Sequence, residues 1–170
     1  MQRLTIRNDV LLPEVVRLLR EDQSVTLRTK GNSMLPFIHG GRDSVVLQYP
    51  HNLHRGDIVL ACLADGRFVL HRIVGFDEDS SRHPQSVVVL MGDGNLCETE
   101  RCTRADITGK AVKIIRNNKY IDCSAPSEQR KVRVWIALLP LRRYLLAIYR
   151  QVYLARIAPT KLQPPKQRYQ

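Results

Sequence analysis

Residues 67–76 read RFVLHRIVGF, and this stretch decides the fold class. Its side chains form two alternating sets, Phe68, Leu70 and Arg72 against Val69, His71 and Ile73, as expected of a β-strand. Similar runs occupy residues 25–30, 44–49, 57–63, 86–92, 106–115 and, less clearly, 119–123. Gly, Pro, Asn and Asp clusters separate the runs, and no long helical pattern intervenes. The sequence therefore predicts a mainly β domain over residues 25–123 rather than a βαβ protein.

Helical spacing of apolar residues occurs only toward the two ends of the chain. An N-terminal segment, residues 1–24, predicts a helix capped by Asn8 or Asp9 that runs to about Asp22 and has an apolar stripe of Val10, Leu11, Val15, Leu18 and Leu19. Residues 130–158 predict an amphipathic basic helix in which Pro140 starts the clearest helical pattern. Its expected apolar face is Leu141, Tyr144, Leu145, Ile148, Val152 and Ala155, opposite Arg142, Arg143 and Arg150. Prolines predict a disordered tail over residues 159–170.

Charge is unevenly distributed along this chain of 170 residues with a formal net charge of +11. Ten Lys and Arg residues and no Asp or Glu follow Glu128. A specific nucleic-acid partner is therefore not expected for the β domain, whose own charges nearly balance. The basic helix predicts either peripheral contact with an anionic membrane surface, docking of an acidic partner, or simple coverage of the β domain with its arginines in water.

The cysteines and the N-terminal residues indicate the cellular compartment in which the protein is expected. Cys62, Cys97, Cys102 and Cys123 match no zinc-ligand spacing, so we expect reduced thiols and neither a metal nor a cofactor. The N-terminal residues are too polar for a secretory signal or a membrane span. A cytoplasmic protein is predicted, with the membrane surface as an alternative location through the C-terminal helix.

The turn that follows the first predicted strand contains a candidate nucleophile, Ser33, within Gly31-Asn32-Ser33-Met34-Leu35-Pro36. A serine hydroxyl needs an exposed tight turn, a nearby base and backbone amides that stabilise an oxyanion. The turn residues Gly31, Asn32 and Met34 are the candidates for shaping such an oxyanion site. A serine in a turn of this composition is structural in most proteins.

His71 is the candidate general base. It shares one side of its strand with Val69 and Ile73, and a histidine on an apolar face needs a partner for each ring nitrogen. A core histidine with purely structural partners is the competing interpretation. Lys30, adjacent to the serine turn, is a rival base.

Asp93, in the turn Gly92-Asp93-Gly94-Asn95, is the candidate acid that orients the imidazole. By itself this motif predicts only a hairpin turn. Asp43 and Asp57 also lie in turns and are rival acids.

The order of these boxes resembles type I signal peptidases and their LexA-like relatives. The resemblance is carried by Gly-x-Ser-Met-x-Pro from Gly31 and by the segments 41–47, 55–60, 71–75 and 92–95, and it covers about residues 25–115. It implies a LexA/signal-peptidase-like β fold and a serine endopeptidase that cleaves a leader or signal-like peptide. Ser33 maps to the nucleophile, His71 to the base of the Ser-His branch, and Asp93 to the acid.

The chain departs from the family at three points. Residues 1–24 predict neither the transmembrane anchor of signal peptidases nor a full helix-turn-helix of LexA. Gly31 stands where many signal peptidases have a serine, so a side-chain oxyanion donor is missing.

Two alternatives to cleavage of a separate peptide or protein substrate are open. The chain could be a non-catalytic β module that contacts a membrane surface or nucleic acid through its basic tail. It could also cleave itself, at residues 80–84 or 124–129.

Overall fold

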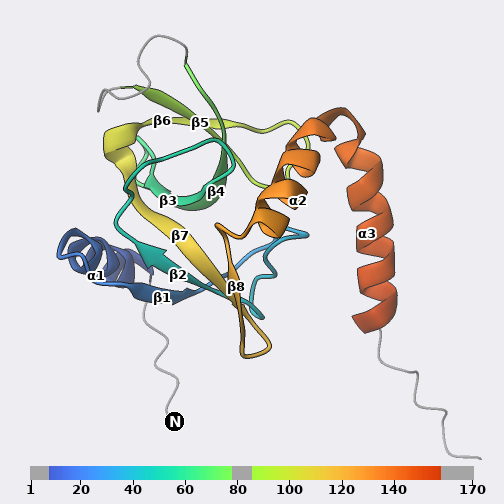
Figure 1. Ribbon diagram of the computed structural model, residues 1–170, viewed down its shortest axis with the longest axis horizontal. Helices are drawn as coiled ribbons and strands as arrows, with labels where there is room; N and C mark the ends of the chain where they lie inside the picture. Colours follow the sequence, from blue (N-terminus) through green and yellow to red (C-terminus); the bar gives the residue numbers. More distant parts are fainter. Residues whose placement is uncertain (1–7, 78–85, 158–170) are drawn as a thin grey trace, which may run out of the picture.

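The computed structural model describes residues 8–77 and 86–157, with only the backbone of residues 8–10 and 153–157. Its centre is one antiparallel sheet that curls into a half-barrel (Figure 1). The strand order is β1-β2-β7-β3-β4-β5-β6, and β8 pairs with β7. The strands are β1 (Val25–Arg28), β2 (Ser44–Gln48), β3 (Ile58–Cys62), β4 (Phe68–Phe76), β5 (Val87–Met91), β6 (Glu100–Thr103), β7 (Ile107–Arg116) and β8 (Lys119–Asp122). The predicted mainly β architecture is confirmed, and β6 is a strand that the sequence analysis did not predict.

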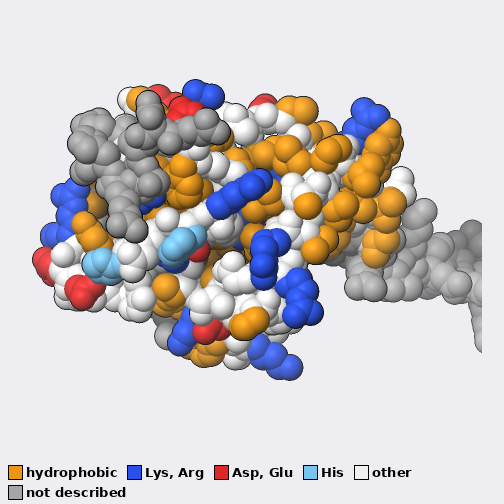
Figure 2. All heavy atoms as spheres, turned by 45° about the horizontal axis from the view of Figure 1, so that its top comes forward, with side chains coloured by type: hydrophobic (Ala, Val, Ile, Leu, Met, Phe, Trp, Pro, Cys, Tyr) orange, Lys and Arg blue, Asp and Glu red, His pale blue; other side chains and the backbone are white. Residues whose placement is uncertain are grey.

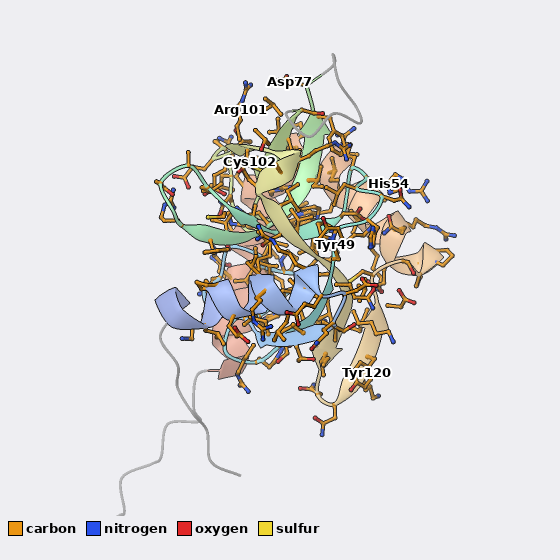
Figure 3. The ribbon with its side chains drawn as sticks, turned by 90° about the vertical axis from the view of Figure 1, so that its left-hand side faces the viewer. Tyr49, His54, Asp77, Arg101, Cys102 and Tyr120 are labelled. Atoms are coloured by element: carbon orange, nitrogen blue, oxygen red, sulfur yellow. The ribbon has the colours of Figure 1, made fainter. Side chains whose placement is uncertain are left out.

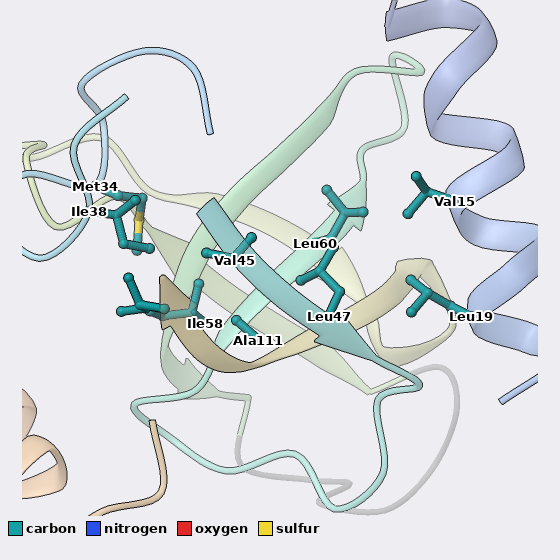
Figure 4. Packing of buried hydrophobic residues seen from close by; sticks show 10 residues of the cluster. Val15, Leu19, Met34, Ile38, Val45, Leu47, Ile58, Leu60 and Ala111 are labelled. Carbon is teal, nitrogen blue, oxygen red and sulfur yellow. The ribbon is translucent and has the colours of Figure 1, made fainter. Parts of the chain in front are cut away.

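The curled sheet has two apolar clusters. The first joins α1 (Asn8–Arg20) to β1, β2, β3 and β7, and Figure 4 shows Val15 and Leu19 of this helix directed at Leu47 and Leu60. Leu19 is fully buried, and truncating such a leucine to alanine typically costs about 2–5 kcal/mol of folding free energy. The alternating sets of β4 divide as predicted, because Phe68 and Leu70 pack against this cluster. Val69 and Ile73 belong to the second cluster, on the side of β5 and β6.

The two ends of the sheet carry different exposed side chains. Figure 3 shows Asp77 and Arg101 at one end, where their charged groups are 3.8 Å apart. Tyr120 lies on the protruding β7–β8 hairpin at the other end. A short 3-10 helix, η1 (Arg104–Asp106), links β6 to β7, and its Asp106 carboxylate accepts from the Thr103 backbone N–H at 2.7 Å.

The region expected as one basic helix over residues 130–158 is two helices. The helix α2 (Pro126–Ala137) begins earlier than predicted, with Pro126 in its first turn, where the missing N–H costs nothing. A 3-10 turn, η2 (Leu139–Leu141), follows, and α3 (Arg142–Ile157) then runs back beside α2 (Figure 1). Pro140 therefore lies in the turn between the helices. The predicted tail at residues 159–170 lies outside the described residues.

The packing of α3 differs from one of the interpretations that the sequence left open, in which the helix covers the β domain and leaves its arginines in water. Arg142 is buried at 1% exposure, with its guanidinium carbon 5.2 Å from the centre of the Trp135 ring and its Nη1 atom 3.4 Å from the Gly92 carbonyl. Leu146 is buried beside it in the helix, and the Tyr149 hydroxyl contacts His39 Nε2 at 2.6 Å. The backbone carbonyls and the aromatic ring bind the arginine, and Leu141, Tyr144, Ile148 and Val152 of the predicted apolar stripe are exposed. The side chain of Ala155 lies outside the described residues.

Candidate active site

The turn that bears Ser33 is held by its own backbone and by two buried side chains. Gly31 has a φ of 76°, the left-handed region that glycine tolerates best. The Ile38 N–H donates to the Met34 carbonyl at 2.9 Å, and the side chains of Met34 and Ile38 are buried in the first apolar cluster. Ser33 itself, next to Met34, is half-buried. These contacts therefore fix the backbone of the turn that bears the serine.

The Gly92-Asp93-Gly94 turn packs directly on the serine. The Gly94 N–H donates to the Ser33 carbonyl at 2.7 Å. A Cβ atom on Gly92 would lie 2.5 Å from the Ser33 carbonyl oxygen, and one on Gly94 would lie 2.7 Å from that of Asn32. Only glycine permits so close an approach of the two backbones. This turn, which the sequence assigned to the catalytic acid, contributes backbone support.

Asp43 lies at the end of the same loop, just before β2, and binds other residues of the loop. Its carboxylate accepts from the His39 backbone N–H at 3.0 Å and from the guanidinium groups of Arg42 and Arg116. Burial by itself would raise the pKa of Asp43, but these hydrogen bonds outweigh it and hold the pKa below the usual range. Asp43 is therefore a buried ionised residue that stabilises the loop between β1 and β2, residues 29–43, which we call the serine loop.

Ser33 and His71 line one open hollow of about 180 Å³, together with Lys30 and Gly31. His71 comes from β4, opposite Val59 of β3, and is 7% exposed. Within the described residues, no hydrogen bond joins the Ser33 hydroxyl to the His71 ring, and such contacts are often long in the absence of substrate. The sequence-predicted nucleophile and base thus share a site. Lys30 is exposed at the same hollow, so the rival base lies there too.

The other ring nitrogen of His71 has a carboxylate partner. His71 Nδ1 lies 2.5 Å from Glu100 Oε2, and the Glu100 side chain is 23% exposed. A hydrogen bond from Nδ1 to this carboxylate fixes the tautomer in which Nε2 is free to accept a proton. The sequence analysis missed Glu100, which lies on the unpredicted strand β6.

The assignment of Asp93 as the acid partner of His71 needs correction. Asp93 is 1% exposed, and both of its carboxylate oxygens accept from Arg72, at 2.8 and 2.5 Å. Successive residues of a strand point to opposite faces, so Arg72 reaches Asp93 while His71 turns toward Glu100. Asp57 is bound to Lys110 at 2.7 Å, and neither it nor Asp43 is the partner of the His71 ring.

The three predicted oxyanion residues differ in how far they are buried. Gly31 and Asn32 are exposed in the turn, whereas Met34 is 4% exposed and packs in the core. Met34 therefore anchors the turn through its side chain, and only its backbone is available for an oxyanion site.

The pairing of β4 leaves backbone groups available beside this hollow. Residues 68–72 pair with β3, whereas β5 pairs only with the part of β4 that begins at Arg72. Among the described residues, Phe68, Val69 and Leu70 therefore have a strand on one side only, and all three line the hollow. Unpaired strand edges of this kind accept extended peptides.

Other chemistry is sparse in the described residues. The four cysteines are free thiols. Among the side chains described, no group of three or more His, Cys, Asp or Glu residues is placed to hold a metal ion. A scan against protein-family models and a search of curated proteins find no match.

Proposed function

We propose that this protein is a serine endopeptidase with a LexA/signal-peptidase-like fold, in which Ser33 is the nucleophile, His71 the general base and Glu100 the acid that orients the base. One observation carries the proposal. Ser33 and His71 line the same hollow, and the Nδ1 atom of that histidine is 2.5 Å from a carboxylate. Such a chain of hydroxyl, imidazole and carboxylate activates serine on several unrelated folds.

In this mechanism each residue has one task. His71 Nε2 takes the Ser33 proton as the oxygen attacks the peptide carbonyl, and it returns the proton to the leaving amine. A water then resolves the acyl-enzyme by the reverse transfers. The Glu100 carboxylate stabilises the imidazolium that forms. Backbone N–H groups of the turn at Ser33 stabilise the oxyanion, because Gly31 supplies no side-chain donor.

The substrate is an extended peptide that pairs with the open edge of β4 at residues 68–70. Main-chain hydrogen bonds to such an edge give affinity without much sequence selection, and pockets for alternate side chains give specificity. The family resemblance implies small residues at the cleavage site. It also implies that the substrate is a leader or signal-like peptide.

Self-cleavage requires a strand-like segment that reaches Ser33. The candidate tract at residues 80–84 lies outside the described residues. The tract at residues 124–129 enters α2 at Pro126, and the Gln129 side chain donates to the Cys123 carbonyl at 2.7 Å. Cleavage there requires the first turn of α2 to unwind, so we favour cleavage of a separate chain.

A peptide library tests this function. The wild-type protein is incubated with peptides of mixed sequence, and products are identified by mass spectrometry. We expect products that disappear in Ser33→Ala, while circular dichroism of the variant is unchanged because Ser33 is not a core side chain. Identical products from wild type and Ser33→Ala would refute the proposal.

A further inference from the structure

An apolar strip runs along the outer side of α3. Tyr144, Ile148 and Val152 of α3 recur every four residues, and they are 54, 61 and 49% exposed. Leu139 and Leu141 of η2 extend the strip at 42 and 52% exposure. We call these five residues the α3 apolar face. Figure 2 shows hydrophobic side chains gathered over this side of the molecule, with Lys and Arg side chains beside them.

The α3 apolar face is held outward by the inner side of the helix. Arg142 and Leu146 are 1% exposed, and Tyr149 contacts His39 of the serine loop. Rotating the strip into the core would withdraw Arg142 from the Gly92 and Asn95 carbonyls, which lie 3.4 and 3.3 Å from its Nη1 atom. The exposed strip is therefore a fixed feature of the folded domain.

The exposed charges of α2 and α3 are almost all positive. Arg130, Lys131, Arg133, Arg143 and Arg150 are exposed on α2 and α3. Glu128 is the sole acidic residue in the sequence of the two helices, and Lys131 neutralises it at 2.5 Å. The guanidinium carbon of Arg143 lies 4.4 Å from the centre of the Tyr144 ring, which places a cation at the border of the apolar strip.

We propose that the α3 apolar face binds an anionic phospholipid surface. An exposed strip of Leu, Tyr, Ile and Val with basic neighbours suits the boundary between lipid headgroups and acyl chains. Two copies joined through this face would bring like charges together. The face would lie along the surface, since no helix in the described part of the chain is long and apolar enough to cross a bilayer.

Vesicle co-sedimentation with the full chain tests this docking surface. The probes are vesicles of phosphatidylcholine alone and an equimolar mixture with phosphatidylglycerol. We expect binding to the mixed vesicles that weakens as salt rises. Ile148→Gln should lower the partition coefficient by about tenfold. Arg143→Gln and Arg150→Gln should each lower it by about fivefold.

Matched controls lie on the β7–β8 hairpin. Tyr120 is 69% exposed, and Tyr120→Gln removes an apolar side chain of similar exposure away from α3. Lys119→Gln removes an exposed charge there. Both should leave vesicle binding unchanged. Ser33→Ala should also bind as wild type does, so loss of the peptidase proposal would not affect this result.

Four outcomes would overturn the proposal. Equal binding of wild type and Ile148→Gln would show that the apolar face does not take part in the interaction. Equal affinity for neutral and mixed vesicles would show that the basic residues do not recognise anionic lipid. A concentration-dependent dimer in analytical ultracentrifugation that Ile148→Gln dissociates would assign the face to a second copy. Salt-sensitive binding to duplex DNA without vesicle binding would assign the cations to nucleic acid.

Discussion

His71 of β4 and Glu100 of β6 are in contact through Nδ1 and Oε2 at 2.5 Å, although β5 lies between their strands in the sheet. Leu90 of β5 pairs with Ile73 of β4 and with Glu100 of β6, so Glu100 lies on the same face of the sheet as Ile73 and, two residues along β4, His71. The strand register thus brings the proposed acid to the proposed base, and Ser33 reaches the same hollow from the loop between β1 and β2.

Glu100→Gln should slow acylation of Ser33 by a serine-directed covalent probe by roughly a hundredfold or more. The amide keeps the size of the side chain but carries no charge to stabilise an imidazolium, and it can favour the wrong tautomer. Labelling rates followed by intact-protein mass spectrometry measure the effect. Glu98→Gln, an exposed acid on the same segment, is the control and should label at the wild-type rate.

The Arg72–Asp93 pair should contribute to stability rather than to proton transfer. Arg72→Met or Asp93→Leu leaves one buried charge unpaired and should lower the free energy of unfolding by about 3–5 kcal/mol. The double variant removes both charges and should be less destabilised than the sum of the single variants. Urea denaturation measures all three, and strict additivity would argue against the pair.

Asp43 should make the serine loop sensitive to acid. Its lowered pKa means that the ionised form stabilises the fold fully above about pH 4, the ordinary carboxyl range, and that this stabilisation is lost as pH falls through the pKa of the folded state. Asp43→Asn should lose about 3 kcal/mol near neutral pH, and its deficit should shrink in acid. Thermal unfolding across pH measures this, with exposed Asp65→Asn as a control expected to change little.

The cysteines should differ in reactivity in the folded protein. Burial raises the pKa of Cys102 and of Cys123 to about 11, so little thiolate forms at either near pH 8. Cys97 is exposed. Iodoacetamide followed by peptide mapping should modify Cys97 first, and all thiols should react alike after denaturation. Equal rates at Cys97 and Cys102 in the native protein would contradict the described burial.

Local patterns predicted the strands that carry strong apolar alternation, and they placed Ser33 and His71 on elements that converge. They failed at β6, because its residues Glu100, Arg101 and Thr103 are polar and Cys102 is its one buried side chain. An edge strand of this kind is specified by its pairing with β5. The periodicity of apolar residues within the strand does not reveal that pairing. The missed strand carried the missed acid.

The orientation of α3 could not be predicted for a related reason. Amphipathic periodicity identified its apolar stripe but left open whether the stripe faces the β domain, a partner or a membrane surface. The buried acceptors for Arg142, the Gly92 and Asn95 carbonyls, come from a turn about fifty residues earlier in the chain. Sequence order alone does not reveal that an arginine has such partners.

The central claim, a Ser33 nucleophile activated by His71, is tested most directly by mapping a serine-directed covalent probe on the wild type, His71→Ala and Lys30→Met. The account predicts one adduct, on Ser33, that forms at a similar rate in Lys30→Met and is lost in His71→Ala. Labelling of Ser33 that survives in His71→Ala but disappears in Lys30→Met would contradict it and make Lys30 the base.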